Sequence, residues 1–110
     1  MPATRLVTRI KRSVAQKRYR IRIHAVRHMV EEGFNERELT EALTGESRVL
    51  EDYPDEFRCL VLGYYPMGGT LRSPLHVVVD YSNEGWIDIV TAYIPQRPWW
   101  TTPDKRGRSK

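Results

Sequence analysis

The chain has 110 residues, 40% of them hydrophobic, which suits a single globular domain and excludes a chain that is disordered throughout. Its net charge is +4, and its one cysteine, Cys59, excludes an internal disulfide and agrees with a cytoplasmic location. The longest apolar runs are only a few residues and the basic start lacks a secretory apolar stretch, so we expect neither membrane association nor export.

The charged residues are arranged in blocks of one sign. Residues 1–28 contain nine Lys or Arg and no acid, whereas residues 29–58 contain ten acids against three bases. Such blocks serve a nucleic acid or an acidic partner, or they face each other inside the fold. Charge alone leaves these alternatives open.

The first predicted helix covers residues 3–18, where apolar side chains recur at helical spacing and the outer face is basic. The sequence RYRIRI at residues 18–23 then alternates charged and apolar side chains, which predicts a short strand. We therefore expect a basic N-terminal helix over residues 1–17 that leads directly into extended chain.

Two further helices are predicted within residues 24–45. The first, HAVRHMVEEGF, ends at Gly33, and the second begins at Asn35, which forms a capping-box pattern with Glu38. Helix-turn-helix proteins that bind DNA share this outline. The second helix is acidic, however, and a recognition helix that faces phosphates is not, so we set that function aside.

Four β-rich runs follow these helices, and turn-type segments separate them. The runs are SRVLEDY, FRCLVLGYY, PLHVVVDY and WIDIVTAYI. Strands joined by hairpins form an antiparallel meander, so the predicted fold class is α+β, with N-terminal helices packed on a four-stranded, mainly antiparallel sheet. We expect one domain over residues 1–96 and a basic, flexible tail over residues 97–110.

Five short motifs in this order resemble the domain-of-unknown-function family DUF4258, a family of small bacterial proteins. The motifs are RIRIHAVRHM, VLEDYP, CLVLGY, PLHVVV and IVTAYIP, and they cover about residues 20–96. That family is regarded as related to RelE-like and MqsR-like toxins. The resemblance implies a RelE-like fold and the toxin component of a type II toxin–antitoxin system, an endoribonuclease that acts on mRNA without a metal or cofactor. Its expected partners are RNA and an antitoxin protein.

The resemblance also implies a catalytic site. The catalytic candidates, which match positions of the family motifs, are His24, His76 and Tyr93. The candidates for binding RNA phosphate are Arg20, Arg22, Arg27 and His28. Metal-free RNA cleavage needs a base for the 2′-hydroxyl, an acid for the leaving oxygen and cations around the phosphate, and histidine and arginine suit these roles.

The sequence departs from the family pattern at two positions. His28 and Glu32 stand where relatives usually have arginine. If those arginines bind phosphate in the relatives, that role here falls to His28, Arg27 or their neighbours.

Each candidate also has a structural interpretation. His24 can cap its helix, His76 can be a hydrogen-bonded strand residue, and an aromatic residue such as Tyr93 is commonly part of a core or a cross-strand pair. His24 and His28 share one helical face, as zinc ligands do, but a clear third ligand is missing and we expect no metal.

The alternative function is a non-catalytic module that binds a protein or RNA. It would use the basic face together with Trp99 and Trp100, which follow the last predicted strand. Exposed tryptophans anchor protein partners and stack on bases.

Overall fold

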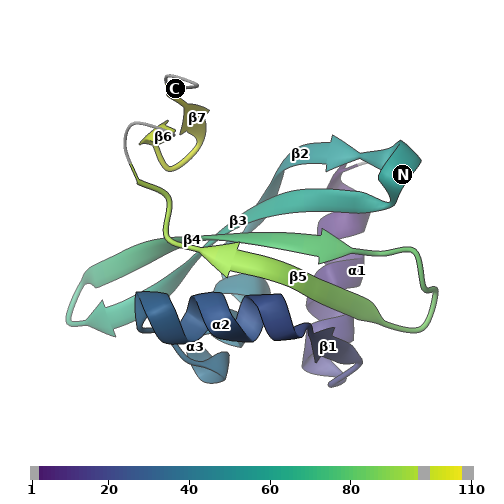
Figure 1. Ribbon diagram of the computed structural model, residues 1–110, viewed down its shortest axis with the longest axis horizontal. Helices are drawn as coiled ribbons and strands as arrows, with labels where there is room; N and C mark the ends of the chain where they lie inside the picture. Colours follow the sequence, from purple (N-terminus) through teal and green to yellow (C-terminus); the bar gives the residue numbers. More distant parts are fainter. Residues whose placement is uncertain (1–2, 97–99, 108–110) are drawn as a thin grey trace.

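The computed structural model describes residues 3–96 and 100–107. The fold consists of three helices packed on a β-sheet. The helices are α1 (Ala3–Ala15), α2 (Ile23–Glu32) and α3 (Glu36–Thr44). The main sheet contains β1 (Tyr19–Ile21), β2 (Arg48–Tyr53), β3 (Arg58–Gly68), β4 (Leu71–Asp80) and β5 (Ile87–Tyr93), and a 3-10 turn at Pro54–Glu56 joins β2 to β3. A hairpin of β6 (Trp100–Thr102) and β7 (Lys105–Arg106) follows the sheet (Figure 1).

The strand order in the main sheet is β1-β5-β4-β3-β2. Strands β2 to β5 pair antiparallel, whereas β1 pairs in parallel with β5. The predicted α+β class with a mainly antiparallel sheet is confirmed, but the predicted number of four strands is wrong. The fifth strand is β1, which lies in the RYRIRI segment that was predicted to be a short strand. Its three residues are too few to predict that it would join the sheet by pairing with a strand 68 positions away.

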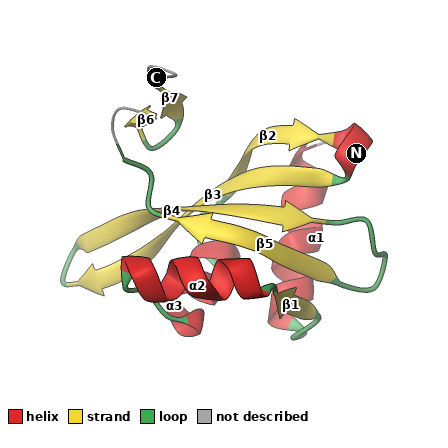
Figure 2. Cartoon of the chain, viewed as in Figure 1, coloured by secondary structure: helices red, strands yellow, loops and turns green. Residues whose placement is uncertain are grey.

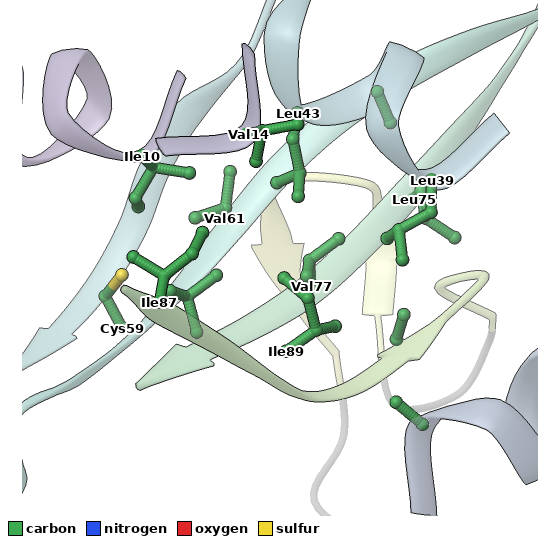
Figure 3. Packing of buried hydrophobic residues seen from close by; sticks show 14 of the residues in the cluster. Ile10, Val14, Leu39, Leu43, Cys59, Val61, Leu75, Val77, Ile87 and Ile89 are labelled. Atoms are coloured by element: carbon green, nitrogen blue, oxygen red, sulfur yellow. The ribbon is translucent and has the colours of Figure 1, made fainter. Parts of the chain in front are cut away.

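The hydrophobic core lies between the helices and one face of the sheet (Figure 3). Leu6, Ile10 and Val14 form one stripe of α1, at the spacing expected for an amphipathic helix. The strands contribute alternate side chains, and the buried ones include Val61, Leu75, Val77, Ile87 and Ile89. Burial of Cys59 in this core raises its pKa to about 12, so the thiol is not an activated nucleophile.

Helix α2 lies beside the part of β5 that does not pair with β1. Strand β1 pairs only with Ile87–Ile89, and α2 packs against the rest of β5 (Figures 1 and 2). Ala25 and Met29 on α2 are buried in the core. At the end of the helix, Glu32 Oε1 accepts a hydrogen bond from the Ile94 N–H at 2.7 Å, which satisfies a backbone donor at the sheet edge.

The hairpin β6–β7 packs on the face of the sheet that the core does not use. The side chain of His76 alternates with the core residues Leu75 and Val77, so it points to the opposite face, where the Trp100 ring lies 4.3 Å from the His76 ring. Leu60 and Leu62 are buried on the same face. The flexibility expected for residues 97–110 stays a prediction, and residues 97–99 and 108–110 lie outside the described part of the chain.

None of the helices in the described part of the chain is long and apolar enough to cross a membrane.

Candidate functional site

An open pocket of about 610 Å³ lies between α2, the end of β5 and the C-terminal hairpin. Its lining residues are His28, Glu32, Tyr93, Ile94, Gln96, Trp100 and Arg106. The volume is in the range of pockets that hold small molecules and nucleotides. Because the lining includes an imidazole, a carboxylate, a phenol and a guanidinium, this pocket is the candidate functional site.

The two histidines of α2 form a pair beside this pocket. The His24 ring is exposed, and its centroid lies 4.5 Å from that of His28, with 49° between the ring planes. His28 is half-buried, lines the pocket, and its Nδ1 lies 3.4 Å from the Thr91 hydroxyl. The four-residue spacing of His24 and His28, which is also the spacing of zinc ligands on a helix, therefore places the two rings in contact with each other. Within residues 3–96 and 100–107, no group of three or more His, Cys, Asp or Glu is placed to hold a metal ion.

His76 is fully buried behind Tyr93 and does not line the pocket. Its Nε2 lies 2.6 Å from the Pro103 carbonyl oxygen and its Nδ1 lies 3.2 Å from the Tyr93 hydroxyl. A carbonyl oxygen only accepts, so Nε2 carries the proton and donates to Pro103. In the neutral ring Nδ1 is then an acceptor, and the Tyr93 hydroxyl donates its proton to His76.

Burial also favours the neutral form of His76. It lowers the pKa of the imidazole below its usual value of 6.5, against the opposing effects of the Pro103 carbonyl and the Glu51 carboxylate. Burial likewise raises the pKa of Tyr93, which keeps the phenol protonated. The His76–Tyr93 pair is therefore uncharged near neutral pH, with the tautomer set by the hairpin.

The depressed pKa of His76 predicts that the fold loses stability in mild acid. The unfolded chain takes up a proton at His76 near pH 6.5, before the folded chain does, so stability is full above this pH and falls as the pH decreases through it. We expect the melting temperature of the wild type to drop more between pH 7.5 and 5.5 than that of His76→Gln. His24→Gln, which removes an exposed imidazole, is the control and should follow the wild type; identical slopes for wild type and His76→Gln would contradict the prediction.

Arg106 brings a positive charge from the hairpin to the pocket. Its guanidinium makes two hydrogen bonds with Glu51, at 2.6 and 2.7 Å, and lies 4.8 Å from the centre of the Trp100 ring. The hydrogen bonds from Arg106 are the main reason that the pKa of Glu51 lies below its usual value. This paired geometry holds Arg106 in place, since a guanidinium and a carboxylate match as two parallel hydrogen bonds.

Arg20 and Arg22 lie outside the pocket, in a row of charges across the sheet. Arg20 is opposite Asp88 in the register and pairs with it at 2.9 Å, and Arg22 lies 2.8 Å from Asp88 and 3.5 Å from Asp80. Burial alone would raise the pKa of Asp88, but the hydrogen bonds from both arginines outweigh it and hold the pKa below its usual value. These two phosphate-binding candidates therefore already have carboxylate partners.

Other basic residues of the N-terminal block are less engaged. Arg27 is exposed on α2, and none of the ion pairs among the described residues includes it. On α1, Arg9 donates to the backbone carbonyls of Tyr81 and Asn83. The acidic block does not form ion pairs with α1 in the part of the chain that the structure describes.

The sequence suggested His28 and Tyr93 as site residues but gave no reason to choose Glu32, Gln96 or Arg106. Glu32 was noted only as a departure from the family pattern, and Arg106 was assigned to a flexible tail. Glu32 and Gln96 are polar residues next to the end of a predicted helix or strand, which is common on any surface, and Arg106 had no signal of this kind. Trp100 lines the pocket and covers His76, whereas Trp99 lies outside the described residues.

Comparison with known proteins agrees with the resemblance noted from the motifs. No curated protein and no solved structure matches the chain. A family model described as "Domain of unknown function (DUF4258)" matches residues 21–94, which include both histidines of α2, His76 and Tyr93. The protein therefore belongs to the DUF4258 family.

Proposed function

We propose that the protein is the toxin component of a type II toxin–antitoxin system, a cytoplasmic endoribonuclease that cleaves mRNA without a metal ion. The observation that carries the proposal is that one pocket contains His28, Tyr93 and Arg106, with His24 in ring contact with His28. These are the groups that metal-free RNA cleavage requires. The assignment of mRNA as the substrate and of an antitoxin as the partner follows from the resemblance to RelE-like and MqsR-like toxins inferred from the sequence motifs, and it is part of this proposal.

In the proposed reaction the 2′-hydroxyl of a ribose attacks the adjacent phosphorus, and the bond from phosphorus to the 5′ oxygen breaks. His28 accepts the proton of the 2′-hydroxyl as the general base, and His24 donates a proton to the 5′ oxygen as the general acid. The products are a 2′,3′-cyclic phosphate and a 5′-hydroxyl. Arg106 keeps its two hydrogen bonds to Glu51 and donates its remaining N–H groups to the phosphate oxygens, where negative charge develops in the transition state.

Tyr93 and His76 have a different task in this proposal. The Tyr93 proton is directed to His76, and the phenol oxygen also receives a hydrogen bond from the Trp100 side chain, so its remaining acceptor site is offered to a hydroxyl of the substrate. His76 is too deeply buried to contact RNA and acts as a positioning residue, because its Nδ1 fixes the direction of the Tyr93 hydroxyl. The sequence-based hypothesis placed His76 in direct contact with the reacting groups; here His28 takes that place.

Cleavage of a 5′-labelled single-stranded RNA in EDTA tests the proposal. We expect the wild type to cut the RNA, to leave 2′,3′-cyclic phosphate ends and to spare a 2′-O-methyl RNA of the same sequence. Tyr93→Phe should reduce kcat about tenfold, since it removes one hydrogen bond. Tyr64→Phe is the matched control, because Tyr64 is also a sheet tyrosine but lies under Arg72, outside the pocket. Activity that EDTA abolishes, or equal cutting of both RNAs, would contradict the proposal.

Growth of a bacterial host under tight induction tests the toxin assignment separately. Arrest by the wild type and relief by Tyr93→Phe, at equal soluble expression, are the expected results. Unaffected growth would contradict the assignment to a toxin.

A second candidate function is a non-catalytic module that binds a protein or RNA. The exposed stripe of α2 favours it, because Ile23 and Val30 are 71% and 77% exposed on either side of Arg27, which is exposed and has no ion pair among the described residues. An unpartnered stripe of this kind is typical of a surface that docks a helix. Binding of the labelled RNA without any cleavage would favour this function over the nuclease.

A further inference from the structure

Glu32 is held at the pocket by the backbone of the sheet. Its Oε1 accepts the hydrogen bond from Ile94 N–H, and the residue lies one helical turn after His28 in the lining of the pocket. Among the described residues, Ile94 is the one hydrogen-bond partner recorded for this carboxylate. A carboxylate has about four acceptor sites, so most of its capacity is left to a ligand.

The remaining groups of the pocket suit the other parts of a nucleotide. Arg106 is positioned for a phosphate, and the rings of Tyr93 and Trp100 offer apolar surface to a base or a sugar. Among the described residues of the lining, Glu32 is the only acid, and it would repel a phosphate. A nucleotide in this pocket therefore orients its phosphate toward Arg106 and its base toward Glu32.

The chemistry of the bases then selects one of them. Guanine presents two adjacent donors on its Watson–Crick edge, N1–H and the N2 amino group, and a carboxylate accepts both. Adenine, cytosine and uracil each place an acceptor next to a donor on that edge, and this acceptor would face the carboxylate. A base whose acceptor faces the acceptor oxygens of a carboxylate loses a hydrogen bond and is repelled, so the carboxylate discriminates strongly against that base.

We infer that Glu32 makes the pocket selective for guanine, so that the substrate is RNA with a guanosine at the cleaved position. The inference rests on the proposed RNA cleavage and adds the base that the site recognises.

Binding of nucleotides to the full chain tests the inference without any need for cleavage. Isothermal titration calorimetry with guanosine, inosine and adenosine 3′-monophosphate should show the tightest binding for guanosine, by at least about tenfold over adenosine. Inosine lacks the N2 amino group and should fall between them. Glu32→Gln should lose about tenfold in affinity for the guanosine nucleotide and keep its affinity for the adenosine nucleotide.

The variants are matched for charge and for folding. Glu32→Gln keeps a side-chain oxygen that accepts from Ile94 N–H, so an unchanged melting temperature is expected. Glu31→Gln removes the same charge from the neighbouring exposed position, outside the pocket, and should bind as the wild type does.

The outcomes separate this inference from the proposed function. Equal affinity for the three nucleotides, no binding of any of them, or unchanged selectivity in Glu32→Gln would overturn guanine recognition. Cleavage of RNA at all four bases alike would also overturn it and would leave the nuclease in place. Selective binding of guanosine without cleavage would support the guanine site and overturn the nuclease.

Discussion

Gly63→Ala is expected to destabilise the fold by about 3 kcal/mol, the largest effect on stability that we predict for a single added methyl group. Gly63 lies on β3 where α3 crosses it. A Cβ at this position would meet the backbone of Ala42, with the Ala42 carbonyl carbon at 2.8 Å and its Cβ at 3.2 Å, and the carbonyl oxygen nearer still. A clash with helix backbone is relieved only if α3 moves away from the sheet.

Helix α3 is not free to move, which is why the effect is large. Leu39 and Leu43 fix it in the core, and its start is held by the capping box, in which Asn35 Oδ1 accepts from Glu38 N at 2.8 Å. Displacement of the helix would therefore open cavities beside both leucines.

Urea unfolding of Gly63→Ala, followed by circular dichroism, measures the effect as a change in the free energy of unfolding. Gly85→Ala is the control, because a Cβ at Gly85 would meet only Asn83 Oδ1, at an ordinary 3.6 Å. We expect this control to change stability by less than about 0.5 kcal/mol. A Gly63→Ala protein as stable as the wild type would contradict the close approach of α3 and β3.

The second large effect is expected for the nuclease reaction, where His28→Ala should lower kcat by about 100-fold to 10,000-fold. The reason is that His28 is the histidine of the described residues that lines the pocket, so its loss removes the base for the 2′-hydroxyl. KM should change little, because Arg106 and Glu32, which bind the phosphate and the base in our proposal, remain.

Steady-state cleavage of the labelled RNA separates kcat from KM. Val30→Ala is the control on the same helix, since its side chain is 77% exposed and outside the pocket, and its kinetic constants should match the wild type. Folding of both variants is checked by their melting temperatures. A His28→Ala enzyme with the wild-type kcat would refute the assigned base, and a rise in KM alone would assign His28 to phosphate binding instead.

Local structure was largely predictable from the sequence. The three helices follow from the spacing of apolar residues such as Leu6, Ile10 and Val14, and the start of α3 follows from the Asn35–Glu38 pair. The strands of the meander follow from β-rich runs between turns. These features depend on residues within about one turn or one hairpin of each other, and short-range periodicity and capping are sufficient to indicate them.

The charges show why pairing between distant segments could not be predicted. The segment that contains Arg20 and Arg22 is as basic as a phosphate-binding segment. In the fold, however, β1 pairs with β5 and places Arg20 opposite Asp88. A three-residue strand has too few side chains to specify its register or its partner. Only the folded sheet decides that these cations pair with carboxylates, while Arg27 has no ion pair among the described residues.

The order of the motifs along the chain established the family, the helical pair His24–His28 and the presence of His76 and Tyr93 on strands. The tertiary structure alone decided which of these groups share a pocket. The hairpin β6–β7 packs over His76, buries that histidine against Trp100 and brings Arg106 to the pocket beside His28. Packing of a segment against a distant strand depends on the summed burial and hydrogen bonding of the whole fold, and no local pattern of residues encodes it.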